Sequence, residues 1–201
     1  LVTNETTKAM QRGPDSLLAR YPYRLALATT GQTLRTVLWS RYPMREGRLL
    51  LRDGLTPTGA HAIVEVAPGV EVSVLGVHFA HGANGNQQRQ IEALDALSER
   101  LPAPRIIMGD FNAAPWSHAI ARTEALTDTR VVPGLRPSWF GPCSALDDRM
   151  RLPPGLPIDH VLVSGGIGVR LIRTVPIPGS DHHGVLAALT LPAADPQGEG
   201  E

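Results

Sequence analysis

One stretch decides the fold of this chain: Arg105-Ile106-Ile107-Met108-Gly109-Asp110-Phe111-Asn112-Ala113-Ala114-Pro115. Its apolar run follows helical sequence and precedes turn residues, which predicts a buried strand. Gly109 has no Cβ, so the backbone can come close to a neighbour there. Asp110 and Asn112 lie two residues apart, and we expect them on the same face of the strand. The stretch therefore predicts a strand that carries an acid and an amide to its end.

An acid beside an amide at a strand end supports two interpretations. The carboxylate can orient a water or bind a hard metal ion, and the amide can hold a phosphoryl or carbonyl oxygen. The same two residues can also form an Asx turn that only caps the strand. On these residues alone the turn is slightly favoured, so the case for chemistry depends on the rest of the chain.

Composition limits the class of protein. The chain has 201 residues, enough for one domain with a substantial core, and 42% of them are hydrophobic, an ordinary globular value. The formal net charge is zero, so no basic surplus drives non-specific binding to nucleic acid. This weakens a polynucleotide substrate without excluding it. The single cysteine, Cys143, excludes an internal disulfide and a cysteine-built metal site.

The ends of the chain leave its localisation unknown. No stretch is long and apolar enough to span a bilayer, and no signal peptide is visible. The chain opens at Leu1 inside an expected strand, so we expect an N-terminal portion to precede it in the native protein. We interpret residues 1–191 as one domain and residues 192–201 as a disordered tail.

Periodicity predicts a chain rich in strands. Alternating patterns and apolar runs predict strands at residues 1–3, 23–29, 36–41, 49–52, 61–66, 71–79, 158–163, 169–177 and 185–191. Helical spacing predicts a helix over residues 86–101 with Asn86 as its N-cap, and shorter helices are expected at 6–12, 14–20 and 115–125. Residues 131–157 are rich in Pro, Gly and Arg, and we expect a long surface loop. Trp139 and Phe140 in this loop could touch substrate, but packing within the loop is favoured.

A βαβ-like unit follows from this order, because the strand at 71–79, the helix at 86–101 and the strand before Asp110 are consecutive. The functional end of such a unit is the carboxyl end of its strands, where His78 and Asp110 both fall. Seven polar residues of the chain lie where an apolar strand ends or a loop begins: Glu5, His78, Asp110, Asn112, Asp159, Asp181 and His182. Each alone has a structural explanation, but together they predict a site.

Three sequence motifs resemble those of the endonuclease/exonuclease/phosphatase superfamily: Gly109-Asp110-Phe111-Asn112, Ile158-Asp159-His160-Val161-Leu162-Val163 and Ser180-Asp181-His182-His183. The segments Val77-His78-Phe79 and Asn4-Glu5 resemble the histidine and the metal-binding glutamate of this superfamily. The resemblance extends to Leu191. It implies an α/β (α+β) fold, a sandwich of two mainly antiparallel or mixed sheets flanked by helices. The first strand of the family fold, which bears an Asn, has no counterpart in this sequence. If the native protein also lacks that strand, catalysis is in doubt.

The resemblance implies a phosphoesterase that depends on Mg²⁺, with Mn²⁺ as the alternative. The expected catalytic residues are His78, Asp110, Asn112, Asp159 and His182, and the expected metal ligands are Glu5 and Asp181. In this mechanism Asp110 orients or deprotonates the attacking water, and Asn112 holds the water or a phosphoryl oxygen. His182 stabilises developing charge or acts as an acid, Asp159 raises its pKa, and His78 donates to a phosphate oxygen.

The substrate class stays open, because a fold does not dictate function. Nucleic acid, a phospholipid headgroup and a sugar or inositol phosphate all fit the resemblance, and the neutral charge argues slightly against a tight DNA binder. No protein partner is evident and we expect a monomer. Bacterial relatives often carry such a domain after membrane-spanning helices, so an extracytoplasmic, membrane-tethered domain is an expectation from the resemblance alone. The alternative function is a catalytically silent binding or interaction domain that kept the fold.

Overall fold

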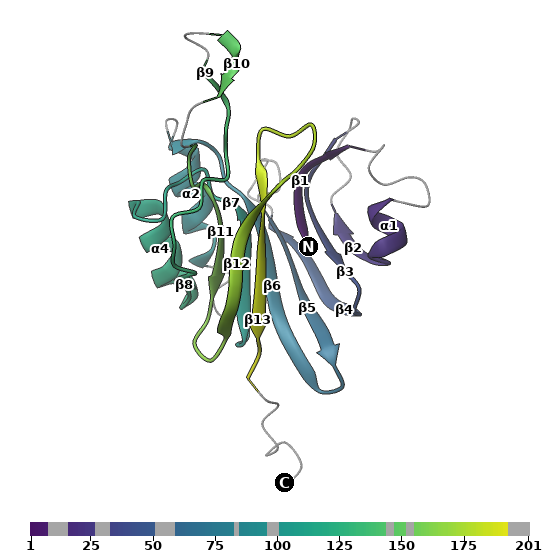
Figure 1. Ribbon diagram of the computed structural model, residues 1–201. Helices are drawn as coiled ribbons and strands as arrows, with labels where there is room; N and C mark the ends of the chain where they lie inside the picture. Colours follow the sequence, from purple (N-terminus) through teal and green to yellow (C-terminus); the bar gives the residue numbers. More distant parts are fainter. Residues whose placement is uncertain are drawn as a thin grey trace, which may run out of the picture.

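A mixed sheet of six strands lies at the centre of the protein, in the order β4-β5-β6-β7-β11-β8 (Figure 1). The computed structural model describes residues 1–7, 16–26, 33–50, 59–82, 85–95, 101–143, 147–151 and 155–192. The six strands are β4 (Met44–Leu50), β5 (Gly59–Ala67), β6 (Val70–His78), β7 (Arg105–Asp110), β8 (Arg130–Val131) and β11 (Asp159–Val163). β6 and β7 run parallel, as the βαβ-like unit predicts, while the other neighbours are antiparallel.

A second layer of strands packs on one face of this sheet. It contains a three-stranded sheet of β1 (Val2–Thr7), β3 (Thr33–Ser40) and β2 (Tyr23–Ala26), and the hairpin β12 (Gly168–Pro176) with β13 (His183–Thr190). Apolar side chains of both layers meet in one core, among them Leu38, Val74, Val161, Ile172 and Leu189. Burying this apolar surface is the main force that holds the layers together. The predicted sandwich of two sheets is confirmed.

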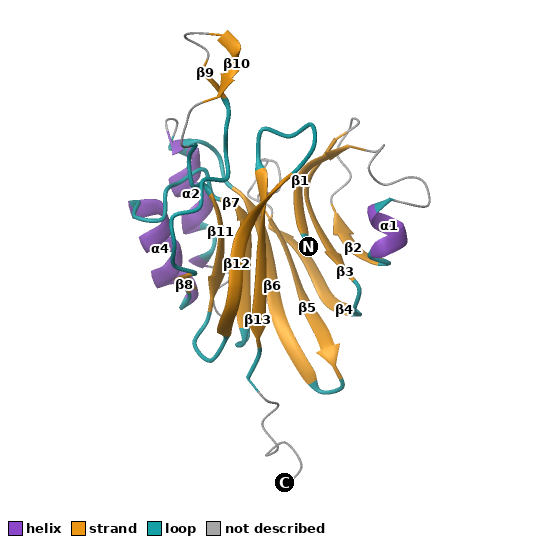
Figure 2. Cartoon of the chain, in the orientation of Figure 1, coloured by secondary structure: helices purple, strands orange, loops and turns teal. Residues whose placement is uncertain are grey.

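Helices cover the outer faces of the sandwich (Figure 2). α2 (Asn86–Glu92) and α4 (His118–Thr127) pack on the other face of the central sheet, where Leu75, Ile107 and Leu162 contact Ile91 and Ile120. Each of these three strand residues follows a residue of the opposite core, as the alternation of side chains along a strand requires. The short helix α1 (Leu17–Arg20) packs against Trp39 of β3. No helix among the described residues is long and apolar enough to cross a membrane.

Gly109 permits the close contact between β6 and β7. Its φ is +142°, a conformation that side-chain-bearing residues rarely adopt, and a Cβ built there would lie 2.0 Å from the carbonyl oxygen of Val77. This confirms the close backbone approach that the sequence predicts at Gly109. The glycine aligns the ends of the two strands, so that His78 of β6 pairs with Asp110 of β7.

Some predicted helix positions are wrong. β1 continues through Thr7, so Thr6 and Thr7 are extended rather than helical, while residues 8–12 lie outside the described part. The N-cap of α2 is Gly85, in the left-handed conformation with φ 65°, rather than Asn86. Glycine adopts this left-handed backbone without strain because it has no Cβ, which suits Gly85 to the N-cap position. The division into one domain and a tail stays a prediction, since residues 193–201 are not described.

The expected loop over residues 131–157 contains regular pairing. Val131 belongs to β8, and β9 (Pro142–Cys143) pairs with β10 (Asp147–Arg151). Trp139 forms isolated antiparallel bridges with Leu156 and with His182. β8 and the single bridges of Trp139 are too short to show a period of two, and they form with partners at least 17 positions further along the chain. Local periodicity therefore gives no signal for them.

Candidate active site

The topology brings four candidate residues to one edge of the central sheet. β6 and β7 are parallel, so His78 and Asp110 end neighbouring strands as register partners. β11 runs antiparallel to β7, so its first residue, Asp159, is also a register partner of Asp110. His182 directly precedes β13, which packs near β11. Residues from four distant parts of the sequence therefore meet at the carboxyl end of β7.

Asn112 turns back onto the carboxylate of Asp110. The strand ends at Asp110, and Asn112 has a φ of 47°, so the expectation that both side chains project from one strand face is wrong. The backbone N–H of Asn112 donates to Oδ1 of Asp110 at 2.8 Å, which is an Asx turn. The Nδ2 group of Asn112 donates to the carbonyl of Phe79 at 2.7 Å and to Oδ2 of Asp110 at 3.3 Å. Asn112 therefore orients Asp110, and it could donate to a phosphoryl oxygen only by giving up one of these bonds.

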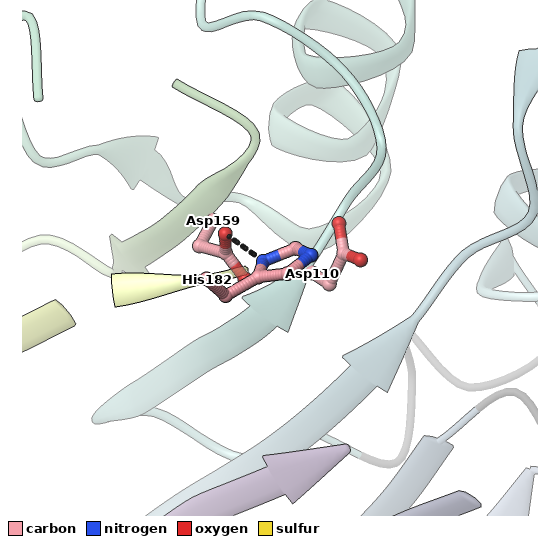
Figure 3. A group of neighbouring side chains, drawn as sticks. All are labelled: Asp110, Asp159 and His182. Carbon is pink, nitrogen blue, oxygen red and sulfur yellow. Dashed lines mark hydrogen bonds and ion pairs between the residues drawn. The ribbon is translucent and has the colours of Figure 1, made fainter. Parts of the chain in front are cut away.

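His182 and Asp159 form the expected acid–imidazole pair. The distance between Nδ1 of His182 and Oδ2 of Asp159 is 2.8 Å, and Figure 3 shows Asp110 on the other side of the imidazole ring. One ligand atom from each of Asp110, Asp159 and His182 lies within 4.8 Å of the others. Because Nδ1 of His182 donates to the carboxylate of Asp159, Nε2 is the ring nitrogen that is available to a substrate.

Burial and like charge make Asp110 a weak acid. Burial of the carboxyl group is the largest cause, followed by the negative charge of Asp159, and together they raise the pKa of Asp110 to about 7. The N–H of Asn112 and the charge of His182 act in the opposite direction, and the charge of Glu5 adds to the increase. A carboxylate with a pKa near neutral pH is a far stronger base than an ordinary aspartate, which suits proton transfer.

The imidazole of His182 offsets part of the negative charge around Asp110. Burial favours neutral His182, but the hydrogen bond and charge of Asp159, together with the charges of Asp110 and Asp181, outweigh burial and raise its pKa. Nε2 of His78 lies 3.6 Å from Oδ2 of Asp110. In contrast, His160 is buried, which lowers its pKa, and it contacts the carbonyl of Ala113 through Nε2 at 2.8 Å. His160 is thus a packing residue.

Glu5 and Asp181 are exposed and join the site through their charges. The charge of Glu5 contributes to the raised pKa of Asp110, and that of Asp181 to the raised pKa of His182. Glu5 has a φ of 53° within β1, a strained conformation for a residue with a Cβ. Among the described residues, the group that could hold a metal ion is Asp110, Asp159 and His182, without Glu5 or Asp181.

The donors present at the site fit a hard divalent cation. The charges of four carboxylates, those of Glu5, Asp110, Asp159 and Asp181, act on one another or on the imidazole of His182, and the surplus of negative charge would be offset by Mg²⁺ or Mn²⁺. The assignment of Glu5 and Asp181 to the metal stays a prediction from the resemblance, since the ligand atoms that lie within 4.8 Å of one another belong to Asp110, Asp159 and His182.

Asn4 adds an oxygen that sequence reasoning missed. Its Nδ2 donates to the carbonyl of Val77 at 3.3 Å, directly before His78, while its buried Oδ1 has no hydrogen-bond partner among the described residues. An unsatisfied buried oxygen is unusual and calls for an explanation such as a water or an ion. The only sequence signal for it was its place beside Glu5.

Ser138 and Trp139 also reach the site, although the sequence marks Ser138 only as part of a loop and favours loop packing over substrate contact for Trp139. The hydroxyl of Ser138 accepts from the backbone N–H of Asp159 at 3.0 Å, and Nε1 of Trp139 donates to Oδ2 of Asp181 at 3.0 Å. No periodic pattern marks these residues. Their contacts with partners 21 and 42 positions further along the chain become visible only in the folded protein.

A cavity of about 390 Å³ lies between α2 and α4, beside the Asp110 turn. Asn112 belongs to this turn and also lines the cavity. The other polar lining residues include Gln87, Ser117, His118 and Arg122. The amide of Gln87 donates to the carbonyl oxygens of Phe111 and Asn112, which fixes the wall between the cavity and the acid.

Comparison with known sequences agrees with this geometry. The profile of the Endonuclease/Exonuclease/phosphatase family matches residues 1–182. A UPF0294 protein of Vibrio vulnificus (strain YJ016) is 32% identical over 155 residues, which cover 77% of this chain and 44% of that protein. Another UPF0294 protein, from Vibrio vulnificus (strain CMCP6), is 35% identical over 123 residues, 61% of this chain and 40% of that protein. The chain thus spans less than half the length of these relatives.

Solved structures share the fold. The 3′ phosphatase NExo from Neisseria, bound to a product DNA hairpin, has a TM-score of 0.66 and 19% identity over 94% of this chain and 88% of that one. Sphingomyelinase C from Streptomyces griseocarneus has a TM-score of 0.56 and 18% identity over 87% and 80%. Because the family profile spans most of the chain and the solved structures share its fold, the resemblance seen in the sequence is confirmed: the chain belongs to the endonuclease/exonuclease/phosphatase family, whose members hydrolyse phosphoric ester bonds.

Proposed function

We propose that this chain hydrolyses phosphodiester or phosphomonoester bonds with a divalent cation, Mg²⁺ or Mn²⁺, and a water activated by Asp110. The observation that carries this proposal is the state of Asp110. Its carboxyl group is buried, has a pKa of about 7, and lies beside the His182–Asp159 pair. A base poised near neutral pH next to a cationic imidazole is the arrangement that attack of water on a phosphate requires.

Each residue has a role in this mechanism. Asp110 takes a proton from the attacking water, and Asn112 holds its carboxylate in place through two hydrogen bonds. Asp159 keeps His182 protonated, so that the imidazolium stabilises the charge that develops on the phosphate or protonates the leaving oxygen. His78 donates to another phosphate oxygen. A cation held by carboxylates such as Glu5 and Asp181 would supply further positive charge at the phosphate.

Two substrate classes are supported by similar structures. One similar protein was solved with a DNA hairpin and another is a sphingomyelinase, so a nucleic acid and a phospholipid headgroup are both candidates. The chain carries no net charge, which favours the smaller substrate over a long polynucleotide. The cavity beside Asn112 offers space for the group esterified to the phosphate. An extracytoplasmic, membrane-tethered location and a monomeric state stay predictions from the resemblance.

The experiment measures hydrolysis of bis(p-nitrophenyl) phosphate, p-nitrophenyl phosphate, plasmid DNA and sphingomyelin vesicles, with Mg²⁺ or with EDTA. Asp110→Asn removes the base, and we expect kcat to fall roughly a hundredfold or more. Asp128→Asn is the matched control, because Asp128 is an exposed residue beyond α4 whose left-handed backbone suits Asn equally well. This control should retain wild-type activity.

The results separate enzyme from binding domain. Hydrolysis that requires the cation and is lost only in Asp110→Asn supports the proposal, and the preferred substrate then assigns the class. Hydrolysis that persists in EDTA or in Asp110→Asn contradicts it. Binding of a phosphate ester without hydrolysis of any substrate would instead support the catalytically silent domain.

A further inference from the structure

Ser138 connects the two segments that carry the acid–imidazole pair. Its side chain is fully buried, and its Oγ accepts hydrogen bonds from the backbone N–H groups of Ile158 at 3.2 Å and Asp159 at 3.0 Å. Its carbonyl oxygen accepts from the N–H of His183 at 2.6 Å. One residue therefore fixes the start of β11, which carries Asp159, relative to the start of β13, next to His182.

Trp139 continues this connection towards Asp181. Its Nε1 donates to Oδ2 of Asp181 at 3.0 Å, and the N–H of Phe140 donates to the carbonyl oxygen of Asp181 at 2.9 Å. Asp181 is thus held through both its side chain and its backbone. The backbone of Trp139 also bridges to His182.

Gly141 makes room for the indole of Trp139. A Cβ built on Gly141 would lie 1.9 Å from a carbon of the indole ring, so a side chain at this position would displace the ring. The missing side chain of Gly141 thus lets the indole of Trp139 take the position from which its Nε1–H group points to Asp181. The hydrogen bond to Asp181 follows from this local fit.

We infer that Ser138 and Trp139 are positioning residues for the proposed reaction, Ser138 for Asp159 and Trp139 for Asp181. The inference rests on the proposed function, because it assigns these residues to the acid–imidazole pair that the function uses. Reacting groups must be held within a fraction of an ångström of their productive geometry, and hydrogen bonds from residues behind them supply this restraint.

A purely structural role accounts poorly for Trp139. Its side chain is partly exposed, and within the described residues it belongs to none of the three buried apolar clusters. A hydrogen bond to an exposed carboxylate contributes little to stability. Its contribution is to the orientation of Asp181, whose charge reaches His182.

The test compares Trp139→Phe, which keeps an aromatic ring but removes the N–H group, with Trp116→Phe. Trp116 is the matched control, because its side chain is 74% exposed on the turn before α4. We expect Trp139→Phe to lower kcat about tenfold with KM within about twofold of wild type, as loss of a hydrogen bond behind an active-site ligand commonly does. Trp116→Phe should match wild type in both constants.

A second readout does not depend on catalysis. The proton between Nδ1 of His182 and Asp159 should give a low-field proton resonance, which Asp159→Asn assigns by abolishing it. We expect Trp139→Phe and Ser138→Ala to shift or broaden this resonance, and Trp116→Phe to leave it unchanged. Thermal unfolding of each variant identifies any that fails to fold, and Trp139→Phe keeps the test valid if Ser138→Ala does not fold.

The outcomes separate this inference from the proposed function. A wild-type resonance and wild-type kcat in folded Trp139→Phe and Ser138→Ala overturn the positioning role. A resonance that changes in these variants supports it, even where the wild-type protein hydrolyses no substrate and the proposed function fails. Equal effects of Trp139→Phe and Trp116→Phe on the resonance also overturn it.

Discussion

Asp110 and Asp159 are register partners across the antiparallel strands β7 and β11, so two carboxylates lie side by side where the strands meet the site. Like charges on directly opposed residues destabilise a sheet. Two features reduce the repulsion between these carboxylates. Asp159 is hydrogen-bonded to His182, and Asp110 stays protonated up to a pH of about 7. The two acids therefore have different roles: Asp159 stabilises the protonated imidazole of His182, and Asp110 acts as a base.

Asp159→Asn should change the titration of both of its neighbours. Removing the charge of Asp159 lowers the pKa of Asp110, because that charge is the second largest cause of its increase after burial. It also lowers the pKa of His182, which then lacks its anionic acceptor. We expect the acid limb of the pH–rate profile to move to lower pH while kcat falls. Titration of His182 by NMR in metal-free protein checks the second effect, and an unchanged His182 pKa would contradict the assignment.

Asp110→Asn should stabilise the protein at high pH in the absence of metal. The pKa of Asp110 is raised from 3.8 to about 7 in the folded protein. The protonated carboxyl group therefore contributes fully to the free energy of unfolding below about pH 4, and this contribution is lost as the pH rises to about 7. The full shift corresponds to roughly 4 kcal/mol at 1.36 kcal/mol per pKa unit. We expect a gain of about 1 to 4 kcal/mol at pH 8 that disappears near pH 4. Urea unfolding with EDTA at both pH values measures it.

Asp128→Asn serves as the control for this stability change, since it replaces an exposed carboxylate of the same type. It should leave the difference in unfolding free energy between pH 4 and pH 8 as in wild type. If Asp110→Asn showed no greater gain at pH 8 than this control, the raised pKa of Asp110 would be wrong, and with it the argument that Asp110 is poised as a base.

Gly109→Ala should unfold or strongly destabilise the protein. The new Cβ would lie 2.0 Å from the carbonyl oxygen of Val77, and the backbone would have to leave its φ of +142°. We expect a loss on the order of 3 kcal/mol or more, because both a clash with backbone and a strained conformation contribute. Denaturant unfolding measures the loss. Gly165→Ala is the control, since nothing lies within 4 Å of a Cβ at that position and its effect should be small.

The centre of the site could be predicted from sequence, because local signals mark it. Asp110 and Asp159 each adjoin an apolar run that predicts a buried strand. A glycine inside such a run, Gly109, indicates a close approach of two backbones. The parallel pairing of β6 and β7 also followed from the strand–helix–strand order, which placed His78 beside Asp110. What the residues alone could not supply was the assignment of Glu5 and Asp181 to a metal, which came from the resemblance to a family.

The surroundings of the site could not be predicted, because they depend on contacts between distant segments. Ser138 and Trp139 contact residues that lie 21 and 42 positions further along the chain, and no periodic pattern in the sequence marks either residue. The left-handed backbone of Asn112 overrides the simple alternation of a strand and redirects its amide. Both cases concern short, irregular backbone whose conformation is set by its partners rather than by propensity.

Asn112 offers the sharpest test of how Asp110 is held. Asn112→Asp replaces the amide that donates to Oδ2 of Asp110 with a second carboxylate, so the pKa of Asp110 should rise further and the acid limb of the pH–rate profile should move to higher pH. Asn112→Ala removes the same donor without adding a charge, and it should lower kcat with a much smaller shift of the limb. We expect kcat to fall about tenfold to a hundredfold in both variants, since a positioned acid–base group loses its restraint.

The contrast between these two substitutions separates charge from position. Steady-state rates from about pH 5 to pH 9 measure both limbs for each variant. A limb that moves equally in Asn112→Asp and Asn112→Ala would mean that the added charge does not reach Asp110. A limb that stays at the wild-type pH in both, with the rate reduced, would show that the group titrating in the profile is not Asp110. In this second case the general base would have to be sought elsewhere in the site, with His78 the next candidate, since its Nε2 lies 3.6 Å from the same carboxylate.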